Sequence, residues 1–161
     1  MIEVLTWLEG SVLGQAVRGA GVWSYAIVNL CHIVGVATLF GSVVILDLKL
    51  LGAFRAVPLG VISIPTVRLA SVGFILALLT GLCLLSTNAT EYAHNPFLLV
   101  KFGAIFVAMV NLLVLHRSSA WRGRVAGEFS ASEQTRLRVG GGVSLAAWTT
   151  ALAAGRMLGY W

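Results

Sequence analysis

Long apolar runs separated by short polar segments divide the chain into four predicted helices. The clearest run extends from Ala26 to Leu46, 21 residues without a formal charge, and Trp23 and Tyr25 precede it. An α-helix needs about 20 predominantly apolar residues to cross the hydrocarbon core of a bilayer. Further runs cover residues 69–85, 97–115 and 139–158. This pattern predicts an all-α membrane protein, a bundle of four transmembrane helices.

The first 18 residues have a different pattern. Apolar residues recur there at helical spacing, at Leu5, Leu8, Val12 and Ala16. Such an amphipathic segment is typical of a helix that lies in the membrane interface. We therefore expect one integral membrane domain over residues 1–161, with an interfacial helix over residues 2–18.

Turn and cap residues mark the predicted helix starts. Pro65 fits the first turn of the second spanning helix, where its missing N–H costs no hydrogen bond. Asn95 precedes a proline and is expected to cap the third helix. Ser130 and Glu133 form a capping-box pattern, so the fourth helix is expected to begin near Ala131.

Small residues recur every four positions in the second span, at Gly73, Ala77 and Gly81. This spacing lets helix backbones approach closely in lipid, although a pore lined by the stripe is an alternative. A related stripe follows the fourth span, at Gly140, Ser144, Ala147, Ala151 and Gly155. Stripes of this kind also suit a structural subunit that docks onto a larger complex or onto a second copy.

Composition agrees with a membrane chain: 58% of its residues are hydrophobic, 11% are charged, and the mean hydropathy is +0.93. The 161 residues leave no room for a separate soluble catalytic domain. The net charge of +5 is dispersed between the spans, so no nucleic-acid partner is expected. No nucleophile–base pair, phosphate loop or hydrolytic motif is present, and a redox role would depend on a bound cofactor.

The distribution of cations predicts the orientation. Connections 1–2 and 3–4 share one side of a four-span protein and hold eight Lys and Arg residues, against three on the other side. An excess of cations marks the cytoplasmic side. We therefore expect a multi-pass protein of the bacterial inner membrane with both termini in the periplasm.

His32 is the first candidate for chemistry, since an imidazole inside a span is costly without a partner. Asn29 and Gly35 flank it at i−3 and i+3, and Gly35 would make room for something flat. Three interpretations stay open: a hydrogen bond to a neighbouring helix, ligation of haem or a metal, and a proton relay.

Charged residues near the same predicted face form the second candidate. Lys101 and Arg156 each lie about one turn inside a span, and Glu91 is the acid in the nearby connection. Glu91 either pairs with these cations or leaves a net positive pocket for a carboxylate or propionate. Asn111 lies loosely on the same side of its helix as Lys101 and is expected to bond another helix or to contribute to this pocket.

A second haem ligand is harder to find. At 1.5 Å per residue, His32 would lie roughly 9 to 15 Å below the outer face and His116 roughly 29 Å below it. His94, in the outer connection, would have to fold inward. His116 and His94 are therefore weaker candidates for an iron than His32.

Several segments carry a resemblance: IVNLCHIVGVATLFGSVVILDLKLLG, LLSTNATEYAHNPFLLVKFGAI, NLLVLH and AAGRMLGYW. They resemble an uncharacterised family of small bacterial four-helix membrane proteins over nearly the whole chain. HIVGVATLFG is also similar to the first-span region of the copper-resistance D proteins, the cytochrome b561 proteins and the membrane protoporphyrinogen oxidases. In those groups a histidine of a four-helix bundle holds haem b, which the resemblance implies for His32; no second histidine stands at a matching depth.

Together these features predict a protein that binds a b-type haem or a similar flat cofactor near the outer face. Electron transfer with a quinone or a partner protein would be its use. The alternatives are a haem-free module for a small anion or proton, and a structural subunit. Copper bound through Cys31, His32 and Met residues is a minor alternative.

Overall fold

The computed structural model describes residues 2–160, which fold into helices and contain no strand. The all-α prediction is therefore confirmed over these residues. The four long helices are α3 (Gly21–Leu51), α4 (Leu59–Thr87), α5 (Pro96–Arg117) and α7 (Ala131–Met157). The shorter elements are α1 (Ile2–Gly10), α2 (Val12–Gly19), η1 (Glu91–His94), α6 (Ser119–Arg122) and η2 (Gly123–Val125).

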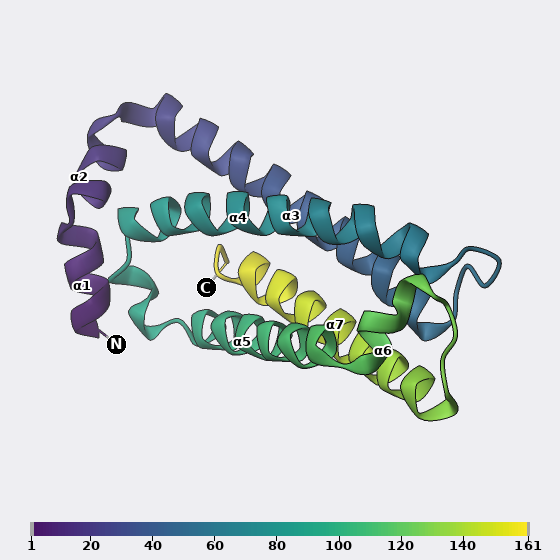
Figure 1. Ribbon diagram of the computed structural model, residues 1–161. Helices are drawn as coiled ribbons and strands as arrows, with labels where there is room; N and C mark the ends of the chain where they lie inside the picture. The colour runs from purple at the N-terminus through teal and green to yellow at the C-terminus, as the bar shows by residue number, and fades with distance from the viewer. Residues whose placement is uncertain (1, 161) are drawn as a thin grey trace.

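The long helices form two antiparallel pairs, α3 with α4 and α5 with α7, and contacts between α3 and α7 join the pairs (Figure 1). Helices α1 and α2 cross one end of the bundle, which we call the α1 end. Helix α6 and η2 lie at the opposite end, which we call the α6 end.

The N-terminal segment is two helices rather than the single predicted one. The side chain of Ser11 accepts a hydrogen bond from the backbone of Gly14 and begins α2. Arg18 then donates to the carbonyl oxygens of Ser86 and Thr87, at 3.2 and 3.0 Å, where α4 ends. A guanidinium at a helix C-terminus also complements the helix dipole. The segment is thereby fastened to the bundle.

The predicted caps of the third and fourth long helices are confirmed. Asn95 accepts a hydrogen bond from the backbone of Phe97, and Ser130 with Glu133 forms the capping box of α7. The prediction for Pro65 is wrong, because α4 begins at Leu59 and Pro65 lies inside it. The hydroxyl of Thr66, the next residue, donates to the carbonyl of Ile62 at 2.7 Å.

Glycine allows α3 and α4 to touch through their backbones. A Cβ atom at Gly73 would lie 2.5 Å from the backbone nitrogen of Leu39, and one at Gly35 would lie 2.7 Å from that of Ala77. Both distances are shorter than van der Waals contact. The predicted stripe of small residues on the second span therefore serves helix contact with α3.

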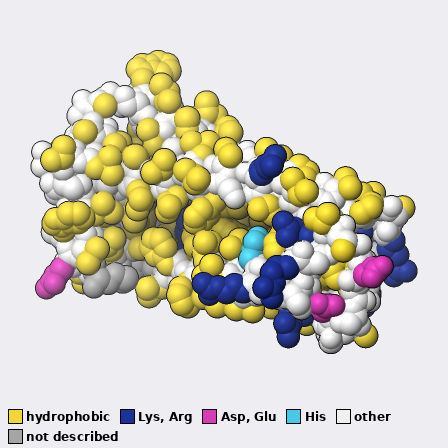
Figure 2. All heavy atoms as spheres, in the orientation of Figure 1, with side chains coloured by type: hydrophobic (Ala, Val, Ile, Leu, Met, Phe, Trp, Pro, Cys, Tyr) yellow, Lys and Arg dark blue, Asp and Glu magenta, His cyan; other side chains and the backbone are white. Residues whose placement is uncertain are grey.

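Among residues 2–160, three helices are long and apolar enough to cross a membrane: α3, α4 and α5, with mean hydropathies of 2.0, 2.3 and 2.4 over their most apolar windows. Helix α7 is not among them, because glycines at 140–142 and hydroxyl residues at 144, 149 and 150 make it more polar. Hydrophobic side chains cover much of the visible surface, while Lys and Arg gather toward the α6 end (Figure 2).

Candidate functional site

His32 lies at the contact between α3 and α4, with its ring half-buried. Its Nδ1 atom is 3.1 Å from the hydroxyl oxygen of Thr80, and its Cε1 atom would be 3.0 Å from a Cβ placed on Gly81. The Thr80 hydroxyl gives its own proton to the carbonyl of Leu76, at 2.6 Å. Thr80 can therefore only accept from the ring, so Nδ1 carries the imidazole proton and Nε2 keeps its lone pair.

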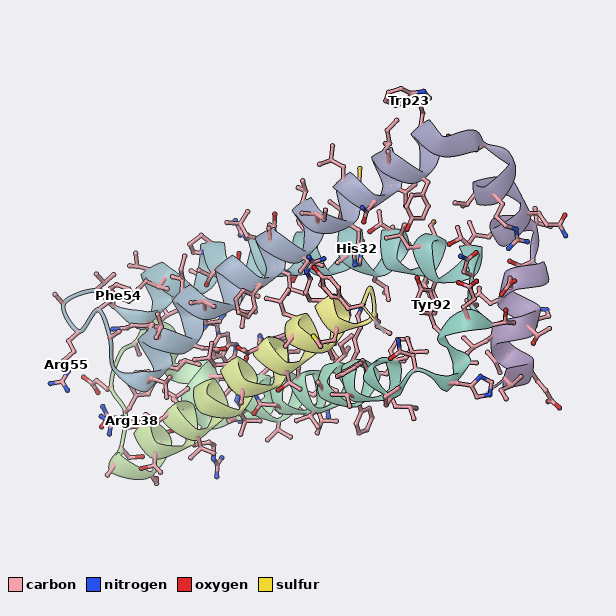
Figure 3. The ribbon with its side chains drawn as sticks, turned by 180° about the vertical axis from the view of Figure 1, so that it is seen from behind. Trp23, His32, Phe54, Arg55, Tyr92 and Arg138 are labelled. Carbon is pink, nitrogen blue, oxygen red and sulfur yellow. The ribbon has the colours of Figure 1, made fainter. Side chains whose placement is uncertain are left out.

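Sequence analysis did not foresee Thr80 and Gly81 as the surroundings of this ring. The backbone of Ala77, one turn earlier on α4, also lies beside the imidazole. In Figure 3 the side chain of His32 points from α3 toward α4, whereas Trp23, near the start of α3, points away from the bundle. The orientation of the ring is thus fixed by groups of a single neighbouring helix.

Lys101 comes from the other helix pair. Its side chain crosses from α5 to α7, where Nζ would be 3.5 Å from a Cβ on Gly155. Within residues 2–160 no acidic side chain pairs with this half-buried ammonium group. Lys101 is also the charged residue whose electric field acts on the imidazole of His32. The structure therefore brings these two predicted site residues together.

Arg156 and Glu91 do not join them. The guanidinium of Arg156 bonds the hydroxyl of Tyr160 and lies 4.5 Å from the centre of its ring. Glu91 is exposed and accepts a hydrogen bond from Asn88 at 3.2 Å. Both side chains interact with close sequence neighbours at the surface.

Gly35 and Asn111 have roles in helix packing. The position beside Gly35 is filled by the backbone of α4, so this glycine brings helices together and leaves no slot next to itself. Asn111 donates from Nδ2 to the carbonyl oxygen of Gly140 at 2.9 Å, which ties α5 to α7.

The other two histidines lie at opposite ends of the bundle. His116, near the end of α5, stacks against Trp121 of α6 with ring centres 4.4 Å apart, and its Nδ1 bonds the carbonyl of Leu112. His94 is exposed at the end of η1. Over residues 2–160, no group of three His, Cys, Asp or Glu side chains is placed to share a metal ion.

A shallow pocket of about 350 Å³ opens at the α1 end. Tyr25, Arg18 and Tyr92 line it together with the residues that end α4. Burial, helped by the neighbouring Tyr25 and Glu91, raises the pKa of the Tyr92 phenol above its usual range. His32 and Lys101 do not line this pocket.

Asp47 is buried although it follows directly on the uncharged run of residues 26–46, a position where a charged residue normally lies at the surface. Its side chain is only 2% exposed. One of its carboxylate oxygens, Oδ2, is buried without a hydrogen-bond partner. Asp47 follows Leu39 and Val43 at a spacing of four residues, and that apolar stripe was the sequence signal for an inward position.

These features define a helical bundle with the length and surface of a membrane protein, whose interior holds an imidazole and an unpaired ammonium group. The chain belongs to DUF6644, a family of unknown function, whose model matches residues 4–161. The expectation of an uncharacterised family is thereby confirmed. No curated protein and no solved structure matches the chain.

Proposed function

We propose that this protein binds a flat, anionic cofactor of the b-type haem class between its two helix pairs, through His32 and Lys101. One observation carries the proposal: an imidazole with a free Nε2 lone pair lies within the field of an ammonium group that has no acidic partner among residues 2–160. Both groups are half-buried, and buried charges are normally paired.

The residues fit such a group in their chemistry. A neutral histidine held through Nδ1–H is the usual form of a metal ligand, and the second hydrogen bond fixes its orientation. An ammonium group that has no acidic partner in the described residues can form an ion pair with a haem propionate. When bound, haem supplies one-electron chemistry, and a quinone or a partner protein would be the electron partner. Gly35, Glu91, Arg156 and Asn111 are engaged elsewhere and are not included in this proposal.

The membrane arrangement is part of the same proposal. Helix α7 runs antiparallel to α5 and, at 1.5 Å per residue, its 27 residues extend about 40 Å, enough to cross the hydrocarbon core. With α7 as a fourth span, the α6 end is expected on the cytoplasmic side, because it carries the cations Arg117, Arg122 and Arg124. The α1 end, with both termini, would then face the periplasm of a bacterial inner membrane.

The test is the absorption spectrum of the protein purified from cells grown with ample haem. We expect a Soret band in the wild type and in His116→Ala, and its loss in His32→Ala. His116→Ala is the matched control, because it also removes a part-buried histidine from a spanning helix. A wild type without a Soret band, or a band that persists in His32→Ala, would contradict the proposal.

A haem-free module for a small anion is the second candidate, and the unpaired ammonium group of Lys101 favours it. Its test is thermal stabilisation of the haem-free protein by small carboxylates and by phosphate. Stabilisation that is lost in Lys101→Met, together with a spectrum without haem, would select this candidate.

A further inference from the structure

Asp47 is a buried carboxyl group at the α6 end of the bundle interior, away from the proposed cofactor site. It lies on the α3 face that also carries Val43 and Leu50, which are 8% and 5% exposed. Outward residues of the same turns, such as Ile45, are 48% exposed. The carboxyl group therefore points into the bundle, and lipid and water do not reach it in this conformation.

Helix α7 closes the site from the other side. A Cβ atom at Gly141 would be 2.8 Å from Cβ of Leu50 and 3.2 Å from the backbone oxygen of Asp47, so the two helices touch there. The hydroxyl group of Ser144, one turn further along α7, lies against the carboxyl group. The other oxygen, Oδ2, is buried and has no partner.

Within residues 2–160, no cation pairs with this carboxyl group. Arg124 of η2, which packs against α4 at the same end, donates to the carbonyl of Trp121. On its own helix, Lys49 donates to the carbonyl of Phe54. The charged residue of α4 is Arg68, which is exposed. Helix α7 carries Arg136 and Arg138, which are exposed, Glu133, which bonds Ser119 and Ser130, and Arg156 at the far end. An ionised carboxylate would therefore be buried without a counter-charge, which is strongly unfavourable.

We propose that Asp47 and Ser144 form a reversible proton-binding site in the interior of the bundle. The carboxyl group holds a proton on one oxygen, and only that O–H bond breaks when the proton passes to water at the α6 end. A metal cation is a poorer occupant, because Na⁺-like and Ca²⁺-like ions need about six oxygen ligands and one carboxyl with one hydroxyl group supplies too few. This proposal does not depend on haem binding.

The sequence allows a test without mutation, since Asp47 is the single aspartate of the chain. Protein made with aspartate labelled at its side-chain carboxyl carbon is reconstituted in lipid vesicles and measured by infrared spectroscopy. We expect a label-sensitive band of a neutral carboxylic acid at neutral pH. The band should shift in D₂O and give way to carboxylate bands as the pH is raised.

Three outcomes would overturn the proposal. The label could report a carboxylate at neutral pH. The acid band could fail to exchange in D₂O or to titrate at any pH where the protein stays folded, which would make Asp47 a sealed structural acid. A carboxylate band that changes when Na⁺ replaces choline would assign a metal cation instead. Asp47→Asn should lack the band, and Glu128→Gln, which alters an exposed acid, should keep it.

Discussion

The two halves of the bundle interior differ in the kind of ionisable group that they leave without an oppositely charged partner. Toward the α1 end, the ammonium group of Lys101 and the imidazole of His32 have no acidic partner among residues 2–160. Toward the α6 end, Asp47 has no cation. Both halves are built from the same helices. The contrast therefore arises from where single polar residues lie on the inward faces.

The apolar core explains why the cation and the acid do not pair with each other. On α7, Gly155 touches Lys101 and Ser144 lies against Asp47, and these positions are eleven residues apart, roughly 16 Å along the helix. Buried Leu39, Val43, Ala104, Ala108, Ala147, Trp148 and Ala151 fill the space between. Because neither group can reach the other, the proposed cofactor site and the proposed proton site are separate.

Of the substitutions that test this contrast, the removal of the Lys101 charge should have the largest effect on haem affinity. Lys101→Met keeps the length and apolar stem of the side chain but loses its charge. Hydrogen bonds to charged groups contribute about 1.5–3 kcal/mol, so we expect haem affinity to fall by about 10- to 100-fold. Titration of the haem-free protein in detergent measures the change.

Two further variants test whether haem affinity depends on the charge at position 101 rather than on a general effect on folding. Lys101→Arg should retain most of the affinity, and Lys49→Met, which removes a cation bonded to a loop carbonyl, should leave it unchanged. Equal losses in Lys101→Met and Lys49→Met would show that the position of the cation does not matter.

The contact between α3 and α4 can be loosened selectively. Gly35→Ala places a Cβ atom 2.7 Å from the backbone nitrogen of Ala77, whereas Gly41→Ala on the same helix meets nothing within 4 Å. We expect Gly35→Ala to lower the free energy of unfolding by about 1–3 kcal/mol and Gly41→Ala to be neutral or slightly stabilising. Thermal unfolding in detergent compares them. Equal unfolding temperatures would refute the backbone contact.

The substitution of Thr80 should have a smaller effect, because it disturbs only the support of the His32 imidazole. Thr80→Val removes the hydroxyl oxygen that accepts from Nδ1 of His32, and loss of such a supporting bond typically lowers metal affinity about tenfold. Thr150→Val is the matched control, since Thr150 also bonds the carbonyl four residues earlier but is exposed. Haem titration of both variants should show a loss in Thr80→Val only.

The smallest effect is expected outside the interior, where Glu9 accepts from the backbone and hydroxyl of Thr90, both at 2.7 Å. These bonds hold the pKa of the Glu9 carboxyl below its usual value of 4.5. Its contribution to docking α1 is therefore present above that value and lost as the pH falls through the lower, folded-state pKa. Hydrogen-exchange protection of residues 2–19, corrected for intrinsic rates, should fall in acid and already be reduced in Glu9→Gln. Unchanged protection would contradict this role, and Glu3→Gln is the control.

Most of the helices could be predicted from the sequence, because apolar runs and helix caps are local signals. The capping box at Ser130 and the small residues at Gly73 and Ala77 are examples. The partners of His32 were not readable, because Thr80 is 48 positions away and its place opposite the ring depends on the register of α4 against α3. The burial of Asp47 could not be predicted either, because a charged residue at the end of an apolar run normally lies at the surface, and Asp47 is buried by the packing of α7 against α3.

The most direct test of the account is a haem titration of the wild type, His32→Ala and Asp47→Asn side by side, followed at the Soret band. The account predicts one haem per chain for the wild type and for Asp47→Asn, and none for His32→Ala. A wild type that binds no haem, or an Asp47→Asn variant that loses it as completely as His32→Ala, would contradict the division of the interior into two separate sites.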